Sequence, residues 1–146
     1  MWRKIINTDA ARSTALIRLL VGSVFLSEGI QKFLIPHIRG AGRFEKIGLP
    51  EPELLGNMVG AFEIICGLLV LLGLITRIAV IPLFAIMIVA FITTKWEILN
   101  QQGIWEWMHA SRTDWSMTVG CIFLWIKGSG AWSVDRKLLN QNIPWK

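Results

Sequence analysis

Four long apolar stretches fill most of this 146-residue chain, at about residues 13–34, 54–74, 78–94 and 113–126. The first stretch contains Glu28 and the second contains Glu63. A charged side chain near the centre of a membrane helix costs about 2.5–3.5 kcal/mol, so such residues are found where they pair inside a bundle or line a polar site. The sequence therefore predicts an all-α, polytopic membrane protein, a bundle of four transmembrane helices around a buried polar cluster.

The composition favours one membrane domain over residues 1–146 rather than a soluble fold. Hydrophobic residues make up 53% of the chain and charged residues only 17%, whereas the surface of a soluble domain of this size needs more charge. The net charge is +5, but the basic residues lie at the ends of the apolar stretches, where they orient a membrane protein. We therefore expect contact with the lipid bilayer and no nucleic-acid partner.

The distribution of Lys and Arg predicts the orientation in the membrane. Four spans place both termini on one side, and that side carries nine basic residues against five on the other. The nine are Arg3, Lys4, Arg12, Arg18, Arg77, Lys127, Arg136, Lys137 and Lys146, and the five are Arg39, Arg43, Lys46, Lys95 and Arg112. Because loops rich in Lys and Arg stay in the cytoplasm, both termini are predicted to be cytoplasmic.

The polar cluster is predicted from position along the helices. Glu28 and Lys32 are four residues apart, the spacing at which an acid pairs best with a following base. At about 1.5 Å of rise per residue, Glu28, Lys32 and Glu63 share one layer in the half of the membrane away from the termini. Arg18 lies on the same stripe of the first helix as Lys32. These four residues are the candidates for ligand binding or proton relay.

Glycines share the stripes that carry these charges. Gly22 and Gly29 lie on the stripe of the first helix, and Gly60 and Gly67 flank Glu63 on the second. Small residues at four-residue spacing let a neighbouring backbone approach closely. Glu63 is therefore predicted to face another helix rather than lipid.

Three roles are open for this cluster on the sequence alone. It could only staple the helices together. It could relay protons or bind the polar head of a redox lipid. It could also lie on a substrate path for transport, although four short helices without an internal repeat or a broken helix argue against that for a monomer. A homo-oligomer would relieve that objection.

Four further residues are weaker candidates. Cys66 and Cys121 lie at similar depths inside apolar stretches, but a disulfide needs α-carbons within about 7 Å, and small buried thiols usually serve as packing groups. His109 and Asp114 border the outer mouth of the fourth stretch, where a lone histidine is usually just solvated. With His37 far from His109, the sequence predicts no metal or haem site.

Several motifs also occur in a fixed order along the chain. They lie at residues 18–22, 28–33, 44–50, 63–77 and 128–135. Together they resemble the DoxX family of small four-helix bacterial membrane proteins. The polar positions that match are Arg18, Lys32, Glu63 and Arg77. The fourth span of the family more often carries a glutamate near its start, whereas here the nearest acid is Asp114.

The resemblance implies a left-handed four-helix bundle in the bacterial inner (plasma) membrane. It also implies a loose association with respiratory or thiol/quinone redox processes, in which the chain would be an accessory subunit. The cofactor stays unknown, with a quinone as one candidate, and protein partners in a membrane redox complex are candidates too. The family supplies no defined catalytic residues, so the chain is expected to be non-catalytic alone or a subunit of an oxidoreductase complex. The alternatives are a non-catalytic scaffold and, ranked last, a transporter of small molecules or lipids.

Overall fold

A computed structural model describes residues 6–141, which contain helices and no strand. The helices are α2 (Thr14–Leu34), α3 (Ala41–Lys46), α4 (Pro52–Leu72), α5 (Thr76–Ala90), the π-helix η1 (Phe91–Lys95), α6 (Trp96–Gln102), α7 (Ile104–Lys127) and α8 (Val134–Gln141). Three of the basic residues used to predict the orientation, Arg3, Lys4 and Lys146, lie outside the described residues.

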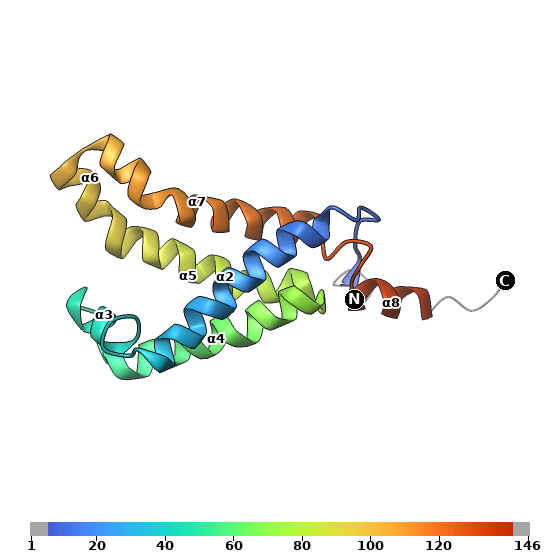
Figure 1. Cartoon of the computed structure of the whole chain (residues 1–146), viewed down its shortest axis with the longest axis horizontal. Helices are drawn as coiled ribbons and strands as arrows, with labels where there is room; N and C mark the ends of the chain where they lie inside the picture. Colours follow the sequence, from blue (N-terminus) through green and yellow to red (C-terminus); the bar gives the residue numbers. More distant parts are fainter. Residues whose placement is uncertain (1–5, 142–146) are drawn as a thin grey trace.

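The long helices form two packed pairs. α2 runs along α4, and α5 runs along α7 (Figure 1). α8 lies beyond the end of the bundle at which α2 begins (Figure 1). At the opposite end, α3 lies next to the pair of α2 and α4, and α6 lies next to the pair of α5 and α7 (Figure 1). The two ends of the bundle therefore differ in what closes them.

Glycines bring α2 and α4 into close contact. A Cβ atom built on Gly22 would lie 2.9 Å from the carbonyl oxygen of Gly67, and one on Gly29 would lie 2.8 Å from that of Gly60. Any larger side chain would push the two backbones apart, as is typical of helix pairs with small residues at their interface. The predicted close approach along these glycines is confirmed.

Three helical segments are long and apolar enough to cross a membrane, namely Thr14–Leu34, Pro52–Leu72 and Thr76–Gln102. Large apolar side chains on their outer faces are exposed, with 68% of Leu16, 57% of Ile65 and 66% of Ile92 accessible. Such extensive apolar surface suits contact with lipid rather than water. The chain is thus an all-helical protein with at least three segments built for a bilayer.

The helix in the position of the fourth apolar stretch differs from the prediction. α7 begins at Ile104, not near residue 113, and most of the segment expected to be a polar connection is helical. Gly103 separates α6 from α7. Its φ of 86° is a backbone conformation that a residue with a side chain rarely adopts. Hydropathy shows only the second half of this helix because the first turns of α7 are polar and Trp-rich.

Candidate functional site

An ion pair joins α2 to α4. The Nζ atom of Lys32 lies 2.6 Å from Oε2 of Glu63, and the two side chains are only 9% and 5% exposed. The predicted pairing of Glu28 with Lys32 is wrong, because Lys32 reaches across to Glu63 instead. The physical reason is burial: a charge removed from water needs a partner that is buried beside it, and Glu28 is only half-buried.

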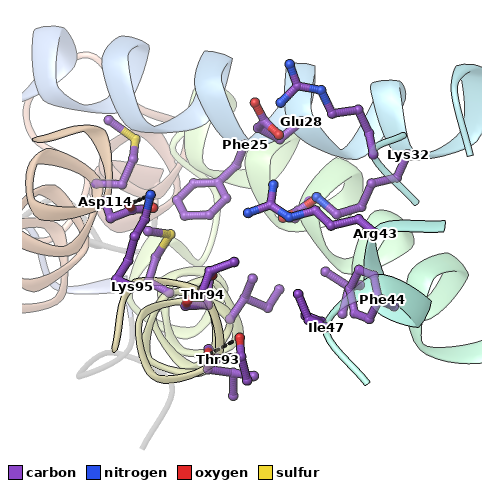
Figure 2. Close-up of a pocket in the computed structure, with 18 of the residues that line it drawn as sticks. Phe25, Glu28, Lys32, Arg43, Phe44, Ile47, Thr93, Thr94, Lys95 and Asp114 are labelled. Atoms are coloured by element: carbon purple, nitrogen blue, oxygen red, sulfur yellow. Dashed lines mark hydrogen bonds and ion pairs between the residues drawn. The ribbon is translucent and has the colours of Figure 1, made fainter. Parts of the chain in front are cut away.

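A cavity of about 580 Å³ opens next to this pair. Its walls come from α2, α3, α4, α5, η1 and α7, so it lies between the two helix pairs (Figure 2). Most of the lining is aliphatic or aromatic, and Phe25 projects into it (Figure 2). Seven ionisable side chains also line it: Glu28, Lys32, Arg39, Arg43, Glu63, Lys95 and Asp114.

A second ion pair lies across the cavity from the first. Lys95, the last residue of η1, has its Nζ atom 3.1 Å from Oδ2 of Asp114 on α7, and Nζ also donates to the carbonyl oxygen of Ala110 at 2.7 Å. Figure 2 shows Lys95 and Asp114 side by side at one edge of the cavity. Asp114, a weaker candidate from the sequence, thus lines the cavity, while Lys95 was not predicted as a site residue at all.

The π-helix sets the position of Lys95. A π-turn inserts one extra residue into a helix and is frequent at functional sites. The hydroxyl of Thr93 donates to the carbonyl oxygen of Val89 at 2.8 Å, and that of Thr94 donates to the carbonyl oxygen of Ala90, so side chains satisfy carbonyls around the turn.

Phe91 begins η1 and meets the rings of Trp107 and Trp115 edge to face, with ring centres 5.5 and 5.3 Å away. This aromatic contact fixes η1 against α7.

Three charged groups of the cavity have no ion-pair partner among the described residues: Glu28, Arg39 and Arg43. Arg43 comes from the short helix α3, and Figure 2 shows its side chain directed into the cavity. No pattern in the sequence marks Arg39 or Arg43 beyond their place in a polar connection, because no local feature indicates that α3 packs against α4. They are the functional candidates that sequence reasoning missed.

Arg18 lies apart from this cavity. It is 6% exposed and belongs to the other end of the bundle. Its Nε donates to the carbonyl oxygen of Val70 at 3.1 Å and its Nη2 to that of Leu71 at 2.9 Å. Its Nη1 donates to the carbonyl oxygens of Ser129 at 2.7 Å and Trp132 at 2.6 Å. Arg18 therefore binds two carbonyl groups in the last turn of α4 and holds the segment after α7; of these two, the Val70 carbonyl also accepts from the N–H of Gly73 at 3.1 Å.

Asp135 completes this end of the bundle. Its carboxylate accepts hydrogen bonds from the backbone N–H groups of Ile75 at 2.8 Å and Thr76 at 3.3 Å, where α5 begins. Its own N–H donates to the carbonyl oxygen of Gly73 at 2.9 Å. Burial raises the pKa of the Asp135 carboxyl above its ordinary value of 3.8, although the two N–H donors oppose that change. We call Arg18, Asp135 and the backbone groups they bind the terminal clasp.

Another residue matched by the resemblance lies near the clasp. Arg77 donates from Nη2 to the carbonyl oxygen of Ile126 at 2.8 Å and so ties the start of α5 to the end of α7. Like Arg18, it serves packing between segments rather than the cavity.

The remaining candidates lie outside the cavity. Cys66 and Cys121 are free thiols buried in the apolar core between the helix pairs, and neither lines the cavity. His109 is exposed on α7, with a ring nitrogen 3.3 Å from Nη1 of Arg112. Among residues 6–141, no three His, Cys, Asp or Glu side chains gather in a way that could hold a metal ion.

Comparison with known proteins bears on the helices that build the cavity. The DoxX family model matches residues 13–96, a range that includes α2, α3, α4, α5 and η1 but not α7. The chain is 48% identical over 143 residues to the uncharacterized membrane protein Rv3486 of Mycobacterium tuberculosis, with 94% of this chain and 88% of that protein covered. No solved structure matches the chain.

Proposed function

The chain belongs to the DoxX family of membrane proteins, and we propose that it binds a small amphipathic molecule of the bilayer in the cavity between its two helix pairs. The candidate ligand is a quinone. In this proposal the protein is an accessory subunit of a redox complex in the bacterial inner membrane, and a partner oxidoreductase carries the electron-transfer centre.

The observation that carries the proposal is the cavity itself. Its volume of about 580 Å³ falls within the roughly 300–1,000 Å³ typical of small-molecule sites. Such sites combine a mostly apolar wall with a few polar groups that fix orientation. Here Phe25 and Phe44 supply aromatic walls, and Glu28 and Arg43 supply charges that form no ion pair within residues 6–141.

A quinone suits these groups chemically. Its two carbonyl oxygens accept hydrogen bonds, which a guanidinium such as that of Arg43 can donate. Its flat ring can lie against Phe25. Reduction to a quinol takes two electrons, supplied by the partner oxidoreductase, and two protons, for which the Glu28 carboxyl is the candidate exchange group. The long apolar tail would leave the cavity between the helix pairs into lipid.

The proposal includes a topology. α7 has 24 residues, and it packs on α5 and α2, so we propose that it is the fourth span. With four spans both ends of the chain lie on one side, and the excess of Lys and Arg at that end supports a cytoplasmic location.

The test is a titration of the full chain in mild detergent with a short-chain quinone. Quenching of tryptophan fluorescence reports binding. Val59→Phe adds a ring to the cavity wall and is expected to weaken binding by roughly tenfold or more, because the ring occupies the ligand's volume. Val119→Phe makes the same change on α7 at a side chain that is 60% exposed, and it should leave binding unchanged. Failure of the unaltered protein to bind, or equal binding by both variants, contradicts the proposal.

The second candidate is a scaffold without a ligand. It is favoured by one observation, that Lys32 and Glu63 bind each other and so act between α2 and α4. If the protein is released from its own membranes with bound polypeptides and no small molecule, as native mass spectrometry would show, the scaffold is the better description.

A further inference from the structure

We propose that a second hollow, beside α3, binds the phosphate of an anionic phospholipid. The hollow has a volume of about 700 Å³ and lies at the end of the bundle away from α8. Three cations line it, Arg39, Arg43 and Lys46. The inference does not depend on what fills the cavity between the helix pairs, although Arg39 and Arg43 border both spaces.

The charge of the hollow is unbalanced. Against its three cations stands one carboxylate, Glu97 of α6, which accepts a hydrogen bond from Nε2 of Gln101 at 2.9 Å. Within residues 6–141, Arg39, Arg43 and Lys46 form no ion pair. Three neighbouring cations with one acid attract an anion, and guanidinium groups match the oxygens of a phosphate in pairs.

The depth of the hollow points to a lipid. α2 is long and apolar enough to cross a membrane, and it ends at Leu34, a few residues before the first of these cations along the chain. Basic side chains just past the end of a span lie at the level of the lipid phosphates. The chain next to the hollow also exposes apolar surface, 74% of Leu34 and 58% of Ile38, which suits acyl chains and not a dissolved ion.

The charge also selects among lipids. In a zwitterionic headgroup the ammonium offsets part of the attraction between the phosphate and the three cations, whereas phosphatidylglycerol carries the phosphate without that ammonium. The occupant is therefore a phospholipid with net negative charge.

Native mass spectrometry of the full chain tests the inference. The protein is released from micelles that contain either phosphatidylglycerol or phosphatidylcholine at the same mole fraction. We expect one phosphatidylglycerol to be retained preferentially. Arg39→Gln combined with Lys46→Gln should lower the retained fraction roughly tenfold, since charge-assisted hydrogen bonds are lost. Arg136→Gln combined with Lys137→Gln removes the same charge at the other end of the bundle and should change nothing.

Each contrary result overturns the inference. Equal retention by the two double variants would show that the hollow holds no lipid. Equal retention of phosphatidylcholine would remove the role of net charge. Displacement of the lipid by inorganic phosphate at the same concentration would assign the hollow to a free anion.

Because the exposed side chains of Arg39 and Lys46 form no ion pair with the described residues, the variant is expected to melt like the unaltered protein. Should the double variant fold poorly, Lys46→Gln alone repeats the test. Val59→Phe, which blocks the other cavity, should retain the lipid, so failure of one proposal is separable from failure of the other.

Discussion

Arg18 and Glu28 lie on the same helix, yet the two ends of the bundle use their charges differently. In the terminal clasp, Arg18 donates four hydrogen bonds to backbone carbonyls of α4 and of the segment after α7, and Asp135 accepts two from the start of α5. At the other end, Glu28, Arg39 and Arg43 border a cavity and have no ion-pair partner among the described residues.

The difference teaches how to interpret a charge in an apolar segment. Hydropathy flags Arg18 and Glu28 alike, because each is a charge in a segment that otherwise suits lipid. The number of protein partners separates them. A charge whose donors are occupied by the backbone stabilises the fold, while one that borders a cavity without a partner is available to a ligand. Lys32 and Glu63 are intermediate, because they line the cavity but bind each other.

The largest expected effect is at the clasp. Arg18→Met removes four hydrogen bonds to buried or part-buried carbonyl groups and should lower the free energy of unfolding by about 3 kcal/mol. Arg18→Lys should recover little, since one ammonium cannot reproduce the geometry of a guanidinium. Thermal unfolding in detergent, followed by circular dichroism, measures both. An Arg18→Met protein that melts like the unaltered one would show that hydrogen bonds do not hold this end.

The intermediate case is the buried ion pair. Lys32→Met should lower the free energy of unfolding by about 2 kcal/mol, because it leaves Glu63 without its partner. The effect is smaller than at Arg18, since a carboxyl can bind a proton whereas a backbone carbonyl cannot. Lys32→Met combined with Glu63→Gln should be more stable than Lys32→Met alone. Additive losses in the double-mutant cycle would mean that the two residues do not interact.

Acidification should produce a smaller change at the clasp. Burial raises the pKa of Asp135 in the folded state above 3.8, its ordinary value in the unfolded state. Between these two pKa values, the folded protein binds a proton at Asp135 that the unfolded chain has lost. The contribution of this residue to stability therefore grows as pH falls from neutral through the folded pKa, and levels off below 3.8. Melting curves across that range should show the unaltered protein gaining stability relative to Asp135→Asn as the pH falls. A constant difference would contradict it.

The smallest expected effect is at Glu28, which borders the cavity at the end of the bundle away from the terminal clasp. Glu28→Gln should change the free energy of unfolding by no more than about 0.5 kcal/mol, because Glu28 has no ion-pair partner among the described residues and is only half-buried. The same melting experiment measures it, with Glu63→Gln as the matched change at a paired acid. A loss of unfolding free energy as large as that of Lys32→Met would show that Glu28, like Arg18, stabilises the fold.

Much of the fold follows from patterns within single helices. Apolar stretches mark α2, α4 and α5, and glycines beside Glu63 predict the face of α4 that packs against α2. The partner of Lys32 was predicted wrongly because spacing along one helix reports only local neighbours, whereas Glu63 reaches it through the rotation of a second helix. Lys95 depends on the extra residue of the π-turn, and Arg39 and Arg43 depend on how α3 folds back. No short-range pattern encodes those placements.

The terminal clasp also has a consequence for biosynthesis. Arg18 is translated before two of its four acceptors, Ser129 and Trp132, which are more than 100 positions later in the chain. Part of the Arg18 guanidinium on α2 therefore lacks its native acceptors until residues 129–132 have been made. A chain that ends before residue 129 still contains α2 and α4, but it lacks two of the four carbonyl groups that bind Arg18.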